Sequence, residues 1–491
     1  MSRINTNVTS LIAQQGLLKS QNDMQVHLQR LSTGLQINSG ADNPAGLIVS
    51  QQLKSEIGGI TQAIGNAQSA INVISTTEAA LNEVSNLLNS IKGLTVQAAN
   101  TSAFSKDEIQ ANQLQIDSAV ESITRIANTT SFAGMKLLDG SLDFVTSGVD
   151  SSKLQDVHVL GANFGTASSI PVSVDVLASA KVGSLFLSTY SAATASGQLL
   201  SSVTFEIAGD KGTQVFSFVS GTKLSAVAFG INQMSDSTGI SARLANSTNQ
   251  TSGLYLESTD FGSSAFVSVN KVSNGSFFQT YSAKGAGGVA TNRDTGQDVL
   301  ALVNGNLALG DGTQISLHSS SLNVDMNLTG AGNTVTGSNP YTFTVTGGGA
   351  RYQIGPSVNS QQQVGFGIQS VAAAHLGNAT VGYLNSIVSG ESNSLVAGNA
   401  AQASQIIDAA INQISVLRGR LGAFQANTLQ TSINSQQIGL ENLTASESQI
   451  TDADFAAETA ALTRAQVLVS AGTSVLAMAN QTSSNVLKLL Q

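Results

Sequence analysis

The chain lacks cysteine and tryptophan altogether, and it has only 4 prolines among 491 residues. Without cysteine no disulfide can hold the fold together, although extracellular proteins with small cores usually rely on disulfides. A large protein that must pass unfolded through a narrow conduit does better without them. The stretch between Arg3 and Lys19 has no continuous apolar run, unlike a secretory signal peptide. We therefore expect that, if the protein leaves the cell, it is exported without a cleavable signal peptide.

Charged residues are scarce as well. They make up 10% of the chain, well below the ~25% of an ordinary soluble domain. The net charge of -9 is spread thinly, and no basic cluster suits nucleic acid. The uncharged stretch between Arg464 and Lys488 is interrupted by polar residues, whereas a membrane span needs ~20 predominantly apolar residues. We predict no nucleic-acid partner, no membrane insertion, and an amphipathic packing helix at this end.

Both ends of the chain carry residues at alternating steps of four and three, the heptad spacing that keeps one stripe of an α-helix facing a partner. We expect two terminal helices that pair with each other and with neighbouring molecules. The predicted stripe, called the seam below, consists of Ile4, Val8, Leu11, Leu18, Leu28, Leu31, Leu35, Phe455, Leu462, Val469, Leu476, Leu487 and Leu490. Since nothing else at either end would cover it, the pattern is typical of an assembly subunit rather than a catalyst.

Longer helices adjoin the two ends. A second helix is expected from about residue 45, and at ~50 residues, or ~75 Å, it favours a rod or coiled coil. A third helix over 109–127 is expected to fold back antiparallel, with a hairpin over 132–140 after it. Helix returns near residue 394, and its seam is predicted to continue beyond Phe424 through Thr428, Thr431, Ser435 and Ile438. The residues predicted to pack these helices are Ile57, Ile60, Ile64, Ile71, Ile74, Leu81, Leu88, Ile414, Leu417, Leu421 and Phe424.

The middle of the chain carries the strand period of two. Residues 172–176 (VSVDV) and 203–207 (VTFEI) alternate in this way, a turn is expected at 209–212 (GDKG), and one short helix is predicted at 225–234. We predict an α+β fold with a long α-helical coiled-coil bundle formed by both chain ends and a β-rich inserted outer domain of one or two subdomains. The predicted boundaries are 1–44 and 451–491 for the terminal core helices, 45–140 and 355–450 for the two halves of a helical shell, and 141–354 for the insertion.

Several short motifs occur in order at the two ends. They are residues 31–39 (LSTGLQINS), 41–47 (ADNPAGL), 132–140 (FAGMKLLDG), 420–423 (RLGA), 450–454 (ITDAD) and 476–481 (LAMANQ). No single motif would suffice, but together they make residues 1–140 and 355–491 resemble bacterial flagellin, the subunit of the flagellar filament. The resemblance implies a homopolymer that serves as the propeller for motility. In such a filament the terminal helices would line a central channel, the adjoining helices would form a shell and the insertion would face outward.

The same resemblance implies partners and a location. Flagellins leave the cell through the flagellar type III export apparatus, and they assemble at the tip beneath a cap. We therefore expect an export chaperone at the C-terminal helix, contacts with the filament cap and hook-associated proteins, and an extracellular location. Lys92 and Leu94 fall on the surface that an innate immune receptor reads in some flagellins. Ser90 and Asn112 stand where a receptor-activating form has Arg and Glu, so strong recognition at this candidate surface is not expected.

Other functions remain open at this stage. A hook–filament junction adaptor would have helices of the same kind at both chain ends, so it is the alternative to the filament subunit. An adhesin or phage-tail fibre would show repeats in its shaft, and none is visible. A displayed enzyme would need a catalytic cluster, yet the 4 histidines are too far apart in sequence to predict a zinc site, and no nucleophile elbow or phosphate-binding glycine loop occurs. We expect no catalytic residues, no metal and no cofactor.

Overall fold

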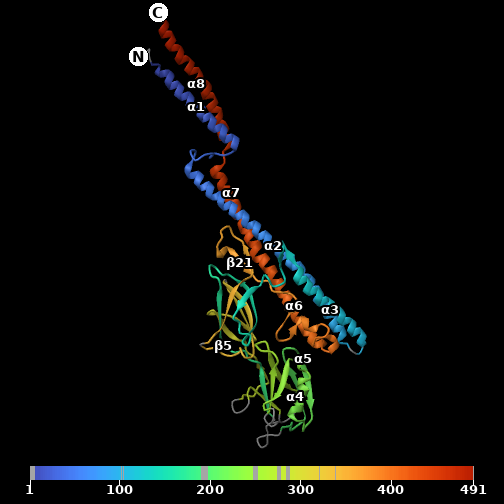
Figure 1. Ribbon diagram of the computed structural model, residues 1–491. Helices are drawn as coiled ribbons and strands as arrows, with labels where there is room; N and C mark the ends of the chain where they lie inside the picture. The colour runs from blue at the N-terminus through green and yellow to red at the C-terminus, as the bar shows by residue number, and fades with distance from the viewer. Residues whose placement is uncertain are drawn as a thin grey trace. The chain divides into compact units, whose positions relative to one another are not determined.

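The computed structural model describes residues 6–100, 102, 104–188, 197–246, 253–273, 278–283, 288–319, 321–337 and 339–489, with side chains described as far as residue 481. Helices lie at both ends of the chain and β-sheets lie between them in sequence, which is the predicted α+β fold (Figure 1). The chain divides into two compact units. The first comprises Met1–Ile71, Gln353–Val358 and Phe424–Gln491, and the second Asn72–Tyr352 and Asn359–Ala423. The predicted boundaries inside the helical ends stay predictions.

The first unit is helical. It contains α1 (Val8–Thr33), the first part of α2 (Pro44–Ala98), the π-helix η5 (Phe424–Gln430), α7 (Thr431–Thr451) and α8 (Phe455–Leu489). Asn7 caps α1, because its side chain accepts a hydrogen bond from the Ser10 N–H at 3.1 Å. Asn43 does the same for α2 by accepting from the Gly46 N–H at 2.9 Å, with Pro44 as the first helical residue. Local sequence therefore sets where both helices begin.

The π-helix corrects one prediction about the long C-terminal helix. The seam was predicted to pass from Phe424 through Thr428, Thr431, Ser435 and Ile438, but Ile438 is exposed, whereas Leu429 and Ile433 are buried. The step from Phe424 to Leu429 is five residues, since a π-turn adds one residue to the helical repeat. The inward face of α7 is therefore displaced by one residue from the uninterrupted heptad.

In the second unit, the rest of α2 packs with α3 (Lys106–Thr129) and α6 (Ala400–Ala423) around a buried aliphatic interior. A capping box starts α3: the Ser105 hydroxyl accepts from the Glu108 N–H, while the Glu108 carboxylate accepts from the Ser105 N–H at 2.7 Å. The predicted hairpin is formed by β1 (Ser131–Phe132) and β2 (Met135–Lys136). The chain reaches α6 through short elements: η2 (Ser360–Gln362), β22 (Gly377–Asn378), β23 (Gly382–Tyr383), η3 (Leu384–Ile387) and η4 (Leu395–Ala397).

The β-rich insertion has two hydrophobic cores. Two antiparallel sheets enclose the first, which includes Val174, Val324 and Phe343. One sheet has the order β15 (Asn306–Leu307), β14 (Leu300–Val303), β5 (Ile170–Ala178), β19 (Tyr341–Gly348), β3 (Phe144–Ser147); the other has β16 (Leu309–Asp311), β17 (Gln314–His318), β18 (Leu322–Leu328), β4 (Leu154–Ala162). A two-stranded sheet of β20 (Ala350–Gln353) and β21 (Gln363–Phe366) follows in sequence.

The second core is nested in sequence inside the first. Its sheets have the orders β12 (Gln279–Tyr281), β6 (Ser184–Ser188), β10 (Leu254–Ser258), β9 (Ile240–Leu244) and β13 (Arg293–Thr295), β11 (Phe266–Lys271), β7 (Val203–Ala208), β8 (Thr213–Phe218). Phe205 is fully buried among Leu256 and Val267. Strands β7 and β8 pair around the predicted turn at 209–212, and the short predicted helix is α4 (Leu224–Asn232), followed by α5 (Ser235–Thr238).

Candidate assembly surface of the terminal helices

Helices α1 and α8 lie side by side and antiparallel, so the two ends of the chain come together (Figure 1). Near the chain ends, the Asn7 amide donates to the Ala479 carbonyl at 2.9 Å. Half-way along, the Leu17 side chain lies against Gly472, where a Cβ atom on the glycine would be 3.4 Å from Leu17 Cδ1. The predicted pairing of the two ends is thus present within one chain.

Small, polar and larger apolar residues alternate along this interface. The stripe of α1 that turns toward α8 consists of Ser10, Ala13, Leu17, Ser20, Met24, His27 and Leu31, all partly buried. On α8 the corresponding residues are Glu458, Ala461, Leu462, Ala465, Val469, Gly472, Leu476 and Ala479, of which Ala465 and Ala479 are buried. No residue of α1 is fully buried. The pair therefore buries little apolar surface, and hydrophobic stabilisation scales with that area.

Only some of the predicted seam residues lie on the face between α1 and α8. Leu31, Leu462, Val469 and Leu476 are partly buried there, and Leu35, beyond the end of α1, is partly buried where it pairs with Asp452. Val8, Leu11, Leu18, Leu28 and Phe455 are exposed, with 59% of Leu18 and 70% of Phe455 accessible, so they do not face the partner helix of the same chain. The reason is that each helix carries more apolar residues than one inward stripe can hold, so the apolar residues outside that stripe are turned to the surface. Ile4, Leu490 and the side chain of Leu487 lie outside the described residues.

An exposed apolar surface results along both helices. In α1 it comprises Val8, Leu11, Ile12, Leu18, Val26 and Leu28, and in α8 Phe455, Val467, Leu468, Val475 and Met478. Soluble proteins rarely leave large contiguous apolar patches open to water unless another molecule covers them.

Three charged or titratable side chains form an ionic cluster across the helix pair. The carboxylate of Glu458 on α8 faces His27 and Arg30, which are one turn apart on α1. His27 Nδ1 lies 2.5 Å from Glu458 Oε2, and Arg30 donates to Oε1 at 3.1 Å. All three side chains are at most 22% accessible. Burial opposes ionisation of Glu458, but the hydrogen bonds from His27 and Arg30 outweigh it, so the pKa of this carboxyl is below its usual value.

Two short segments join this helix pair to α2 and α7. Leu35 and Asp452 form an isolated antiparallel bridge, in which the Gln36 N–H donates to the Thr451 carbonyl at 2.7 Å. The Ala453 N–H donates to the carbonyl of Gly34, the left-handed residue that ends α1. Both connections are therefore tied to each other next to the ionic cluster.

The residues predicted to pack the long helices are largely interior. Ile60, Ile71, Ile74, Leu81, Leu88, Ile414, Leu417, Leu421 and Phe424 are buried, and Ile57 and Ile64 are partly buried. At the candidate receptor surface Leu94 is partly exposed, and the Lys92 ammonium forms an ion pair with Asp408 of α6. Part of that candidate surface is thus committed to holding α2 and α6 together.

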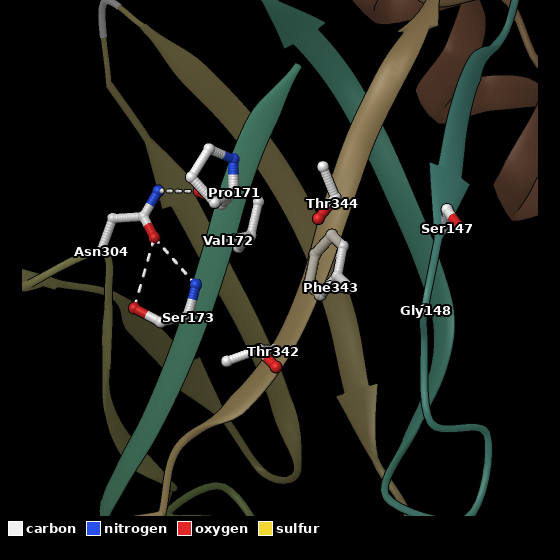
Figure 2. A pocket seen from close by; sticks show the side chains of 9 residues that line it. All are labelled: Ser147, Gly148, Pro171, Val172, Ser173, Asn304, Thr342, Phe343 and Thr344. Atoms are coloured by element: carbon white, nitrogen blue, oxygen red, sulfur yellow. Dashed lines mark hydrogen bonds between the residues drawn. The ribbon is translucent and has the colours of Figure 1, made fainter.

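A hollow of about 400 Å³ lies on the five-stranded sheet of the insertion (Figure 2). Its lining includes the hydroxyls of Ser147, Ser173 and Thr342, and Asn304 closes one side by accepting from the Ser173 N–H at 2.8 Å and donating to the Pro171 carbonyl at 3.1 Å. The lining has hydrogen-bonding groups but no titratable side chain, so it offers neither an acid nor a base for catalysis.

Two further features bear on partners. Among the described residues, no group of three or more His, Cys, Asp or Glu side chains could hold a metal ion. Within the same residues, Phe455–Gln481 is long and apolar enough to cross a membrane by length and composition alone. One such helix is weak evidence for a span, and this one contacts α1.

Comparison with known proteins decides the family. The model of the bacterial flagellin N-terminal helical region matches residues 4–143, and that of the C-terminal helical region matches residues 404–490. The B-type flagellin of Pseudomonas aeruginosa is 31% identical, and the alignment covers 99% of each chain. The chain belongs to the bacterial flagellin family. A flagellin of Salmonella rubislaw is 29% identical with 99% of each chain covered, and flagellin B of Helicobacter pylori strain J99 is 28% identical with 100% of this chain and 99% of the relative covered.

As a flagellin the chain is a structural subunit of the flagellar filament, which lies outside the cell. The full-length relatives favour this over the hook–filament junction adaptor. Among solved structures, the D1-D2-D3 domains of the Escherichia coli flagellar cap protein are similar over 49% of this chain and 64% of that chain at 19% identity, with a TM-score of 0.30. That likeness is too low to add to the assignment.

The ionic cluster of this flagellin was missed in the sequence, although a signal for it existed. Apolar spacing defined the seam, so His27, Arg30 and Glu458 were left out of it. Charged residues are only 10% of the chain, and the one acidic residue within the helix α8 is Glu458. A lone carboxylate on an otherwise apolar and small-residue face predicts a specific cationic partner.

Proposed function

We propose that this flagellin polymerises with copies of itself through the outward faces of α1 and α8. The observation that carries the proposal is the exposed apolar surface on both helices, from Leu11 and Leu18 to Leu468 and Met478. A neighbouring copy with the same surface would remove these side chains from water, at about 25 cal/mol per Å² of apolar area. The predicted seam residues Val8, Leu28 and Phe455 belong to this surface, so their role is intermolecular.

The other parts follow from the same arrangement. The interior residues of α2, α6 and α7 form the shell that supports the terminal helices, and the β-rich insertion faces outward. The chain acts mechanically, as part of a propeller, and carries no catalytic residue, metal or cofactor. It is exported without a cleavable signal peptide, with an export chaperone covering the apolar face of α8 before assembly. The filament cap and hook-associated proteins are its further partners.

Seeded polymerisation tests the proposal. Purified full-length chain is mixed with sonicated filament fragments in a polymerising salt and inspected by electron microscopy. The parent is expected to extend the fragments into long uniform filaments. Leu468→Asp places a charge on the proposed interface, so its elongation should fail or slow strongly.

A matched control separates assembly from folding. Val219 of the β-rich insertion is also a largely exposed aliphatic residue, so Val219→Asp introduces the same charge far from α8 in sequence. This variant should elongate like the parent. Equal elongation by the Leu468 and Val219 variants would remove α8 from the polymerisation surface.

A further inference from the structure

We propose that Glu458 determines the register in which α1 pairs with α8, by selecting His27 and Arg30 and by rejecting Asp23. The consequence of this register for assembly rests on the proposed polymerisation through the terminal helices. The structure shows one register, in which the Glu458 carboxylate is hydrogen-bonded to both His27 and Arg30. The question is what prevents the helices from sliding by one heptad.

Apolar packing does not prevent it. Leu17 lies against Gly472, and the equivalent positions one heptad away on α8 are Ala465 and Ala479, which differ from glycine by a methyl group. On α1 the heptad equivalents of Leu17 are Ser10 and Met24, both partly buried in the same stripe. The larger inward residues of α8 recur at the same spacing, as Leu462, Val469 and Leu476. An interface that repeats so closely every seven residues specifies register weakly, and a polar or charged group is the usual way to specify it.

Charge does distinguish the registers. Residues 20 and 23 occupy the heptad positions of His27 and Arg30 one repeat earlier, so a slip in that direction brings Glu458 against Ser20 and Asp23. The carboxylate would then lose its donors and meet a like charge. The opposite slip brings it to Gly34 and Ile37, beyond Thr33, where α1 ends. Either slip leaves a partly buried carboxylate without partners, which is costly in free energy.

The register matters for assembly because it places one apolar surface relative to the other. A slip of one heptad moves α8 along α1 by about 10 Å. Leu468 and Met478 would then no longer lie beside the same residues of α1, and a neighbouring copy would meet a different surface. The cluster also lies next to the paired segments at Leu35 and Asp452, so it selects the register at the point where the two helices begin to pair.

The absence of cysteine from the chain makes the register directly measurable. A Cβ atom built on Gly472 lies 3.7 Å from Leu17 Cβ, which is within the range that a disulfide requires. The pair Leu17→Cys with Gly472→Cys therefore reports the observed register. Ser10→Cys and Met24→Cys, each with Gly472→Cys, report the two slipped registers.

The three double-cysteine proteins are kept soluble and full-length, and the rates at which their disulfides form on oxidation are compared. With Glu458 present, the Leu17 pair should form its disulfide at least about tenfold faster than the other two, a ratio that corresponds to about 1.4 kcal/mol. Glu458→Gln should reduce the ratio of the Leu17 rate to the Ser10 rate and the ratio of the Leu17 rate to the Met24 rate. Glu458→Arg should raise the rate of the Ser10 pair above that of the Met24 pair, because an arginine is repelled by Arg30 and attracted by Asp23.

Two compensating variants complete the test. Asp23→Asn in the Glu458→Arg background should abolish the gain of the Ser10 pair. Arg30→Glu in that background should restore the Leu17 pair, because it re-creates an opposite charge at the observed partner. Equal disulfide rates for all three cysteine pairs with Glu458 unchanged would overturn the proposal. The same conclusion would follow if Glu458→Arg left the relative rates of the three pairs unchanged.

The soluble measurement does not depend on filament formation. Relative disulfide rates report register preference even when the helices pair for only part of the time. Failure of the parent to elongate seeds would therefore count against the proposed function and leave the register result standing. A register shift in Glu458→Arg together with normal elongation would confirm the role of Glu458 in pairing and refute its consequence for assembly.

Discussion

His27 Nδ1 of α1 and Glu458 Oε2 of α8 are 2.5 Å apart, although the two residues are 431 positions apart in sequence. Arg30 donates to the second oxygen of the same carboxylate at 3.1 Å. In a helix pair that buries little apolar surface, this cluster is the main charge-assisted contact between the two chain ends, and such contacts are stronger than neutral hydrogen bonds.

Pairing of the terminal helices should weaken in acid because of Glu458. The pKa of this carboxyl is held below its usual value of 4.5. A group whose pKa is depressed on pairing stabilises the paired state above its unpaired pKa, and that contribution is lost as the pH falls through the lower value. Arg30 of the cluster also acts on Asp42, whose own pKa is lowered by hydrogen bonds from Ser39 and Asn38 and, to a smaller extent, by Arg30.

Circular dichroism at 222 nm between pH 7 and pH 2 measures this effect. The full-length parent should lose helical signal below about pH 4, near the usual carboxylate range, and Glu458→Gln should lack that component. Asp42→Asn is the control for the neighbouring carboxylate. A pH profile that is the same for the parent and Glu458→Gln would assign the acid sensitivity to other groups.

Truncation of Leu81 should destabilise the helical bundle. Leu81 is fully buried in α2, so Leu81→Ala removes apolar contacts and leaves a cavity, at a cost of about 2–5 kcal/mol. Leu114→Ala on α3 is the matched control, because 61% of Leu114 is exposed and exposed substitutions usually change stability by less than ~0.5 kcal/mol. Urea unfolding followed by circular dichroism should separate the two variants. Similar midpoints would place Leu81 outside the interior.

Deleting one residue from the π-helix should be tolerated, whereas a deletion about two turns later should not. Removal of Asn427 converts the five-residue step between Phe424 and Leu429 into an ordinary helical step and keeps Ile433 inward. Removal of Ser435 leaves the π-turn in place and rotates the rest of α7 by about 100°. Thermal melting should show an unchanged or higher midpoint for the first variant and a lower one for the second. The reverse order would mean that the π-turn itself stabilises the helix.

Deletion of residues 456–491 should abolish polymerisation and leave the insertion folded. Both β cores are built from residues between Phe144 and Val345, so neither contains a residue of α8. Near-ultraviolet circular dichroism and limited proteolysis should show a protected insertion, while seeded growth is absent. A loss of protection in the β sheets would show that they depend on the terminal helices.

The sequence by itself determined the architecture. The four–three periodicity specified the long helices, alternation specified the strands of the insertion, and side-chain caps such as Asn7, Asn43 and Ser105 act within a few residues, so their effect is readable locally. The motifs at both ends were sufficient to identify the flagellin family. Interior positions such as Leu81 and Leu421 follow from the same periodicity, because a buried stripe repeats with the helix.

Only the tertiary structure decided which face of each helix meets which neighbour. Leu11 and Leu18 satisfy the heptad rule, yet they are exposed, because Ala465 and Gly472 allow a close approach along a different stripe. A π-turn after Phe424 shifts the α7 face by one residue, and apolar spacing alone cannot show such an insertion. Glu458 meets His27 and Arg30 across 428 or more positions. Contacts of that kind depend on how the two ends fold together, and periodicity within one helix carries no information about the register of its partner.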